Sequence, residues 1–216
     1  MSSAARLIED AKALGVTLSA ADAERLLRLL EELTRWNRTY NLTAIRSPEA
    51  MLTHHLLDSL AIERDLSGSR IADVGTGAGF PGLPLAVANP TREFTLIDSN
   101  GKKIRFVSHA VHALGLTNVT VVHARVETLR PETPFETIVT RAFAPLPEML
   151  PKIVPLCGDT TVVLAMKGRY PEEEIAALPA PWKVSGSRAL TIPGLDAARC
   201  VIRLSYGTGE RRPGGA

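Results

Sequence analysis

The feature that most constrains this chain is a glycine-rich loop between a short apolar run and an apolar helical stretch. The apolar run covers residues 71–74, the loop 75–82 and the helical stretch 83–88. Glycine lets the chain turn sharply and lets a ligand approach the backbone where a Cβ atom would collide. We therefore expect a nucleotide-like ligand to lie on this loop.

Short β-rich runs alternate with helical stretches after residue 69. Continuous apolar runs indicate strands that are covered on both faces, as in a parallel sheet whose crossovers are helices. These runs cover residues 71–74, 94–98, 119–122, 137–139 and 161–165. Two further runs, 189–191 and 200–204, are joined by a Pro193-Gly194 turn without a helix, which predicts an antiparallel hairpin. The fold class is therefore α/β: a doubly wound, Rossmann-like, mostly parallel seven-stranded sheet that ends in this hairpin.

The N-terminal part of the chain is predicted to be helical. Apolar residues recur at helical spacing up to Trp36, after a capping-box pattern at Ser19 and Asp22. Ser47-Pro48 predicts the start of a second helix that runs toward residue 63. We expect residues 1–66 to form a helical appendage on a core of residues 67–207, and residues 208–216 to form a flexible tail, within one structural domain.

Composition excludes several classes of protein. Hydrophobic residues make up 45% of the chain and charged residues 22%, which is close to the globular average. No uninterrupted apolar segment predicts a membrane span or a secretory signal, so we expect a cytoplasmic protein without a membrane partner. Cys157 and Cys200 are the only cysteines, so no disulfide framework is expected. A net charge of +2 is too small to identify a nucleic-acid-binding protein.

The histidines do not predict a metal site. His54 and His55 are adjacent, so a helix points them in different directions. His109 and His112 lie one turn apart, but the sequence shows no third ligand for them. We therefore expect no metal cofactor.

Two acidic residues suggest which ligand the glycine loop holds. Asp98 ends the next strand about 20 residues after the loop, where a carboxylate can accept hydrogen bonds from ribose hydroxyls. The glycine spacing is G-x-G-x-G and not the G-x-G-x-x-G of dinucleotide-binding folds, and Asp73 precedes it. A carboxylate there would repel a pyrophosphate and attract the positive charge of S-adenosylmethionine (SAM). The alternative is a tight strand-to-helix turn with a solvated Asp98.

The third and fourth strands are followed by further candidate site residues. Arg125-Val126-Glu127 could hold an adenine ring through a backbone amide and an apolar side chain. Arg141-Ala142-Phe143 follows the fourth strand and would face cofactor and substrate, because ligands in such sheets bind at the carboxyl ends of the strands. The alternatives are a solvent-facing charge for Glu127 and a structural ion pair for Arg141.

These motifs resemble those of the bacterial small-subunit ribosomal RNA methyltransferase G family, also called glucose-inhibited division protein B. The matching stretches are residues 36–37, 40–43, 54–60, 73–84, 125–127, 140–142 and 166–168. The resemblance implies a class I methyltransferase fold, SAM as methyl donor and S-adenosylhomocysteine as product. It also implies methylation of N7 of one guanine in the 530 loop of 16S ribosomal RNA, in the small ribosomal subunit.

The resemblance also implies a set of cofactor-binding residues. By the family pattern, these are Gly75, Phe80, Val126, Glu127 and Arg141, with Asp98, Ser99 and Asn100 on the ribose and adenine side. Asp73, Gly77 and Gly79 complete the loop. Residues 98–103 depart from the family's frequent Asp-Ser-x-x-Lys-Arg-like pattern, and this departure falls on Ser99 and Asn100.

Guanine N7 carries a lone pair and no proton, so its methylation needs neither a general base nor a covalent intermediate, only alignment. Arg141 would orient O6 or a phosphate, and Asn41 would hydrogen-bond the target base or the cofactor unless it only stabilises a turn. RNA would lie across a set of basic residues, and we expect a monomer. This set is Arg35, Arg38, Arg46, Lys102, Lys103, Arg105 and Lys167.

Three other functions stay open. The first is SAM-dependent methylation of another substrate. The second is an NAD-dependent oxidoreductase, and the third is an RNA-binding assembly factor without catalysis.

Overall fold

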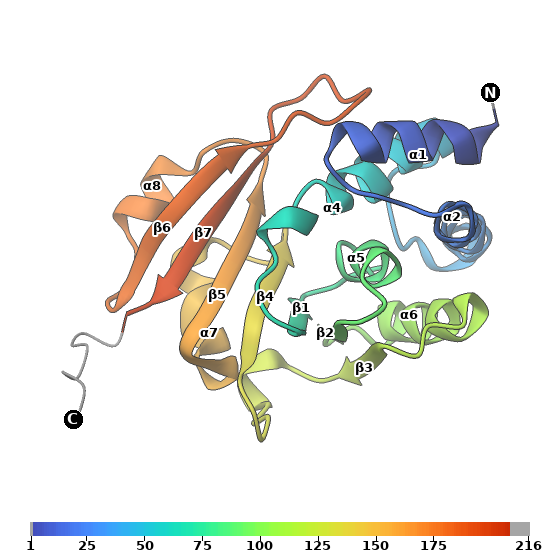
Figure 1. Cartoon of the computed structure of the whole chain (residues 1–216). Coiled ribbons are helices and arrows are strands. Elements are labelled where there is room, and N and C mark those ends of the chain that lie inside the picture. The colour runs from blue at the N-terminus through green and yellow to red at the C-terminus, as the bar shows by residue number, and fades with distance from the viewer. Residues whose placement is uncertain (1, 208–216) are drawn as a thin grey trace.

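A seven-stranded sheet forms the centre of the molecule in the computed structural model, which describes residues 2–207 (Figure 1). Its strand order is β3-β2-β1-β4-β5-β7-β6. The strands are β1 (Arg70–Val74), β2 (Glu93–Asp98), β3 (Val119–His123), β4 (Phe135–Arg141), β5 (Cys157–Lys167), β6 (Trp182–Ala189) and β7 (Cys200–Tyr206). β1 to β5 run parallel, whereas β7 runs antiparallel to both β5 and β6. The predicted fold class is confirmed.

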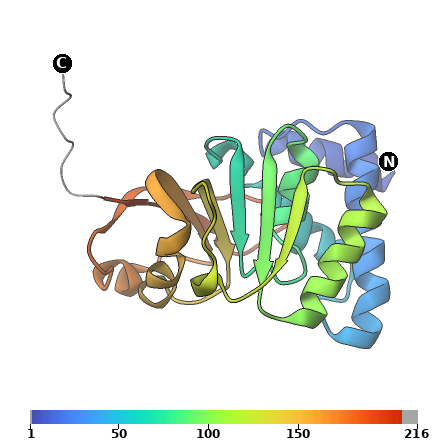
Figure 2. The ribbon, with the colours of Figure 1, turned by 90° about the horizontal axis from the view of Figure 1, so that it is seen from below.

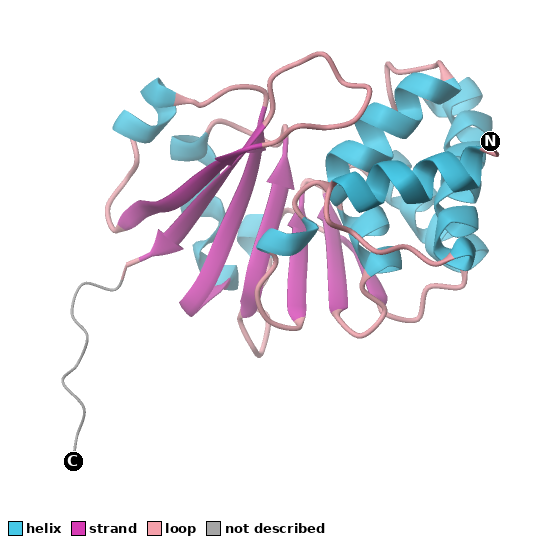
Figure 3. Ribbon diagram, turned by 45° about the horizontal axis from the view of Figure 1, so that its top comes forward, coloured by secondary structure: helices cyan, strands magenta, loops and turns pink. Residues whose placement is uncertain are grey.

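Helices cover both faces of the sheet (Figures 1 and 3). They are α1 (Ser3–Ala13), α2 (Ala20–Tyr40), α3 (Pro48–Met51), α4 (Asp58–Leu60), α5 (Gly82–Ala88), α6 (Gly101–Leu114), α7 (Leu146–Ile153) and α8 (Glu172–Ala176). The side chains that α1, α2, α5 and α6 bury form one apolar cluster with one face of the sheet. α7 packs on the other face and forms a second cluster with inward-facing residues such as Ile138 and Val163.

The capping box predicted from the sequence is present at the start of α2. The Asp22 amide donates to Ser19 Oγ, and the Ser19 amide donates to Asp22 Oδ2, both at 3.1 Å. The helix runs to Tyr40, four residues beyond the predicted apolar stripe. α1 buries Leu7 and Ala11, so the N-terminal residues fold back onto the other helices.

The second predicted helix begins at the expected place but is not uniform. Ser47 caps α3, with Pro48 in its first turn. A π-helical segment, η1 (Leu52–Leu57), then separates α3 from α4, and a short 3₁₀ turn, η2 (Glu63–Asp65), follows. π segments inside α-helices frequently occur at functional sites. This one carries His54 and His55 toward the end of β4.

The first strand of the predicted hairpin was misplaced. We expected residues 189–191, but β6 spans Trp182–Ala189, and Leu190 and Thr191 belong to the connection to β7. β6 is an edge strand whose exposed face carries Lys183 and Ser185. Few of the inward positions of β6 carry large apolar side chains, so the alternation of polar and apolar residues that indicates a strand is weak there.

Two observations concern membranes and the C-terminus. Over residues 2–207, none of the helices combines the length and the apolar character that crossing a bilayer requires. The predicted tail, residues 208–216, lies outside the described part of the chain.

Candidate functional site

A crevice of about 300 Å³ opens at the carboxyl ends of β1, β2 and β4. These ends lie at one edge of the sheet (Figure 2), which is where open α/β sheets bind ligands. Five of the predicted cofactor-binding residues line it, namely Gly75, Asp98, Ser99, Val126 and Glu127. Phe143, which was expected to face cofactor and substrate, lines it too, and so do Lys103 and Lys152, which were not predicted as cofactor-binding residues.

The glycine loop forms one wall of this crevice. The amides of Gly75 and Thr76 both donate to the Ile97 carbonyl, at 2.9 and 3.1 Å, which ties the loop to β2. Gly75 has a φ of +70°, and a Cβ at this position would lie 2.3 Å from Phe143 Cδ2. Both the backbone conformation and the close approach of Phe143 therefore require glycine at position 75.

Asp73 lies beneath the glycine loop and not in the lining of the crevice. Its side chain is fully buried, and Oδ2 accepts hydrogen bonds from Thr76 Oγ1 and the Gly82 amide, both at 2.7 Å. Burial raises the pKa of Asp73 to about 6, against the opposing effect of these two hydrogen bonds. Oδ1 is buried without a hydrogen-bond partner among the described residues. Asp73 thus fixes the loop to the start of α5 and keeps one oxygen uncommitted.

Asp98 and Asn100 are both held by backbone amides. Asp98 Oδ2 accepts from the Gly77 amide at 2.9 Å, and Oδ1 accepts from the Asn100 amide at 2.8 Å. Asn100 is the N-cap of α6, because its side-chain oxygen accepts from the amides of Lys102 and Lys103. Asp98 is therefore presented to the crevice, whereas Asn100 does not line it.

Phe80 joins the glycine loop to the helical appendage. Its ring stacks on His55 at a centroid distance of 4.7 Å, and the Arg141 guanidinium lies 5.7 Å from its centroid. The ring is 3% exposed and is not part of the crevice lining. Burial, with the positive charge of Arg141 as the next cause, lowers the pKa of His55 to about 4, so His55 is neutral near pH 7.

Arg141 belongs to a cluster of ion pairs. A structural ion pair was the alternative to ligand binding that the sequence left open for this residue. Its Nη1 donates to Asp58 Oδ2 at 2.8 Å and to the His54 carbonyl at 2.9 Å. The other Asp58 oxygen accepts from Arg199 Nε at 3.1 Å. Asp58 and Arg199 were not predicted as site residues. The two arginines share one nearly buried carboxylate, so two positive charges meet one negative charge at this edge.

Asn41 is the C-cap of α2. It adopts a left-handed conformation with φ of 49°, and its side-chain oxygen accepts from Arg46 at 3.4 Å. The loop that follows is held by Asn37, whose buried amide group exchanges two hydrogen bonds of 2.9 Å with the backbone of Thr43. Thr43 Oγ1 lies 3.0 Å from His55 Nε2. Asn37 was not predicted as a functional residue, although it lies in the Trp36-Asn37 motif.

The predicted basic residues differ in how they are held. Lys167 is bound by both carboxylate oxygens of Glu174, and Arg35 pairs with Glu32. Within residues 2–207, the others form no ion pair; they are Arg38, Arg46, Lys102, Lys103 and Arg105. The structure thus leaves five of the seven cations without a carboxylate partner in the described part of the chain.

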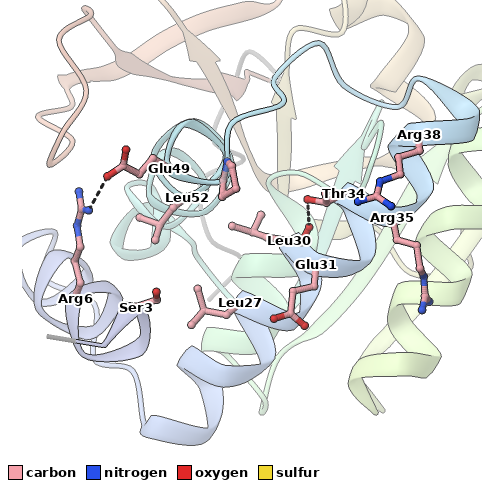
Figure 4. A pocket seen from close by; sticks show the side chains of 11 residues that line it. Ser3, Arg6, Leu27, Leu30, Glu31, Thr34, Arg35, Arg38, Glu49 and Leu52 are labelled. Carbon is pink, nitrogen blue, oxygen red and sulfur yellow. Dashed lines mark hydrogen bonds and ion pairs between the residues drawn. The ribbon is translucent and has the colours of Figure 1, made fainter.

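A second and larger cavity, of about 680 Å³, lies among α1, α2 and α3 (Figure 4). Leu27, Leu30 and Leu52 form its apolar part, and its rim carries both basic and acidic side chains. The Arg6–Glu49 ion pair joins α1 to α3 there, at 3.3 Å. The cavity is formed by the helical appendage and shares no lining residue with the crevice at the sheet edge.

The described residues contain no group of three or more His, Cys, Asp or Glu side chains suited to hold a metal ion. The crevice is instead lined by glycine backbone, apolar side chains and single charged groups.

Comparison with known protein families gives one match over most of the chain. The family model described as rRNA small subunit methyltransferase G matches residues 22–202. Two curated relatives bear the name ribosomal RNA small subunit methyltransferase G. The protein of Idiomarina loihiensis is 46% identical over 88% of this chain and 92% of its own length. That of Saccharophagus degradans is 46% identical over 94% of this chain and 91% of its own length.

Solved structures agree on the fold. A SAM-dependent methyltransferase from Aquifex aeolicus is similar with a TM-score of 0.56 and 18% sequence identity, covering 77% of this chain and 97% of that one. At this identity the likeness concerns the fold alone.

Proposed function

Because this chain belongs to the rRNA small subunit methyltransferase G family, we propose that it methylates N7 of one guanine in the 530 loop of 16S ribosomal RNA. The family makes it a SAM-dependent methyltransferase. The observation that supports a methyl-transfer site is the crevice at the carboxyl ends of β1, β2 and β4, which the glycine loop, Asp98 and Val126 line together. The rival assignment to NAD chemistry has no comparable support.

The residues of the crevice fit SAM. Gly75 lets the Phe143 ring lie directly against the loop at the wall of the crevice, Asp98 offers its carboxylate to the ribose hydroxyls, and Val126 is a buried apolar residue beside which an adenine can lie. Ser99 and Glu127 complete the ribose and adenine side. The contacts described above let Gly77, Asp73, Phe80 and Asn100 shape the loop and its surroundings. Gly79 donates its amide to the Thr76 carbonyl at 2.9 Å and accepts from the Leu83 amide at 2.8 Å, which joins the loop to α5.

When bound, SAM supplies an electrophilic methyl group on a positively charged sulfur. The guanine N7 lone pair needs no proton removed, so the chain does not have to provide a general base. Its contribution is to hold the base in line with the methyl group and to exclude other orientations, which is catalysis by proximity and orientation. The methylated guanine gains a positive charge, which carbonyl and carboxylate oxygens at the edge stabilise.

We assign substrate orientation to the Arg141 cluster. Arg141 and Arg199 share Asp58, so the cluster keeps an excess positive charge at the end of β4. Such a charge attracts a guanine O6 or a phosphate oxygen. Asn41 lies at the end of α2 with its side chain held only by a long contact to Arg46, and it is the candidate to hydrogen-bond the target base.

The test is methylation of small ribosomal subunits from a bacterial strain that lacks its own enzyme of this family. We expect labelled SAM to yield one 7-methylguanosine per 16S RNA, mapped to the 530 loop by mass spectrometry of nuclease fragments. Incorporation at another nucleotide, or none from a preparation that binds SAM, would overturn the substrate assignment. Binding of NAD in place of SAM in isothermal titration would overturn the reaction as well.

The same proposal names the partner and the compartment. The substrate is the small subunit or its 16S RNA, which places the protein in the cytoplasm with the ribosomes. A monomer is the proposed active form, which light scattering during gel filtration tests.

A further inference from the structure

Within residues 2–207, two large hydrophobic side chains are exposed, Tyr40 at 39% and Tyr170 at 46%. An exposed aromatic ring gives little to folding, because its surface is not removed from water. Tyr40 ends α2, and Tyr170 follows β5 by three residues. Both therefore lie toward the edge of the sheet that carries the crevice.

α2 packs alongside α6 (Figure 2), and this packing sets the position of Tyr40 at the end of α2. The two helices run antiparallel: Glu32 contacts His109, with 2.7 Å between Oε2 and Nε2, and Trp36 packs on Phe106 at a centroid distance of 5.7 Å. One further turn along α2 brings Tyr40 to the level of the first turn of α6. The first turn of α6 comes shortly after Asp98 and Ser99, which line the crevice at the end of β2.

The Tyr40 ring is held from one side only. Its centroid lies 5.3 Å from that of Trp36 with an interplanar angle of 32°. Trp36 is itself packed between α2 and α6, through Phe106 and His109. The tyrosine ring is thus fixed in orientation while much of its surface stays open to solvent.

The charges around the two exposed tyrosines differ. Tyr40 lies one turn beyond Trp36 on α2, and Lys102 lies one turn before Phe106 on α6, so the two residues are at the same level of the helix pair. Lys102 has no ion-pair partner in the described part of the chain. Tyr170 is followed by Glu172 and Glu173 in the next turn. A phosphate chain is attracted to the first surroundings and repelled by acidic side chains in the second.

From these contacts we propose that Tyr40 is a stacking platform for an unpaired base next to the target guanine, with Lys102 contacting a flanking phosphate. This inference rests on the proposed function and specifies its substrate as a single-stranded or looped segment of RNA. Sequence-tolerant recognition of unpaired RNA uses this combination of an aromatic ring and basic side chains. Tyr40 is a positioning residue for RNA and does not contact SAM.

The experiment compares Tyr40→Ala, Tyr40→Phe and the wild-type protein with small ribosomal subunits as substrate. Loss of one base stack is expected to raise KM for the RNA substrate about tenfold. We expect kcat at saturating substrate and the Kd for SAM to stay within about twofold of wild type, since the ring is outside the crevice. Tyr40→Phe keeps the ring and is expected to keep the wild-type KM.

Tyr206→Ala is the matched control. Tyr206 also packs on a tryptophan, Trp182, at a centroid distance of 4.9 Å, but it ends β7 and pairs with the first residue of β6, so it lies at the opposite edge of the sheet. It is expected to change melting temperature as Tyr40→Ala does and to leave KM unchanged. An unchanged KM in Tyr40→Ala would overturn the proposal, as would an equal rise in Tyr206→Ala or in Tyr40→Phe.

The salt dependence separates stacking from phosphate contact. Tyr40→Ala is expected to weaken binding of small subunits without changing the slope of log K against log salt, whereas Lys102→Gln should reduce that slope. A reduced slope in Tyr40→Ala would contradict stacking. If the wild-type protein methylates no RNA, the proposed function is wrong. If the wild-type protein and Tyr40→Ala methylate RNA equally well, the proposed function holds and only the role of Tyr40 is wrong.

Discussion

Replacing Gly75 with alanine tests whether the glycine loop is the wall of a SAM site. The φ of +70° costs an alanine roughly 1 to 2 kcal/mol relative to glycine. In a chain of this size this corresponds to a loss of about 2 to 8 °C in melting temperature. The new Cβ would also lie 2.3 Å from Phe143 Cδ2, so the ring must move within the crevice. We expect the Kd for SAM, measured by isothermal titration, to rise at least about tenfold, or 1.4 kcal/mol.

Gly77→Ala is the matched control for this variant. Gly77 has a φ of +61°, but a Cβ there meets nothing closer than 3.9 Å, and the residue is not part of the crevice lining. Both variants should therefore lose similar stability, whereas only Gly75→Ala should lose SAM affinity beyond about threefold. Equal loss of affinity in both variants would refute the reasoning, because it would trace the effect to backbone strain and not to the space beside Phe143.

Three further predictions concern buried charged or ionisable groups. His55 is neutral in the folded protein with a pKa of about 4, so the protein takes up a proton at His55 when it unfolds below pH 6.5. Wild type therefore loses stability as pH falls, and His55→Phe should lose about 2 to 3 kcal/mol less free energy of unfolding between pH 7.5 and pH 4.5, measured by urea titration. The pKa of Asp73 is raised to about 6, so ionisation of this buried group lowers the stability of the folded protein as pH rises from 4 to 6. Asp73→Asn should remove this loss of about 3 kcal/mol, so that stability rises more steeply with pH in the variant than in wild type. The variant should also bind SAM more weakly, because the carboxylate that attracts the ammonium group of SAM is gone. Asp58→Asn leaves Arg141 without its counter-charge and is expected to lower stability by about 2 kcal/mol and to raise KM for RNA; a variant with unchanged melting temperature and unchanged KM would remove the cluster from the mechanism.

The parts of the site that could be predicted from the sequence are those that lie at the carboxyl ends of parallel strands. The glycine loop, Asp98 and the segment at Val126 each follow a strand directly, and parallel strands bring their carboxyl ends to one edge. Knowledge of the sheet therefore sufficed to place them together. Asn41 is a different case, because a capping residue and a ligand-binding residue have the same sequence pattern. The structure shows the capping role in its left-handed φ of 49°.

The contacts that could not be predicted join residues far apart in the sequence. Asp58 meets Arg141 across 83 positions and Arg199 across 141, and nothing in the local pattern of any of the three residues selects these partners. The connection depends on the π-helical segment, which sets the direction in which the following residues point, and on β7 entering the sheet beside β5, which brings the start of β7 to the end of β5. Because β7 is antiparallel, its first residues lie at the same edge as the last residues of β4 and β5. The C-terminal hairpin therefore does more than complete the sheet: it delivers a second arginine to the edge where the parallel strands alone would present one, and this accounts for the local excess of positive charge proposed to orient the RNA.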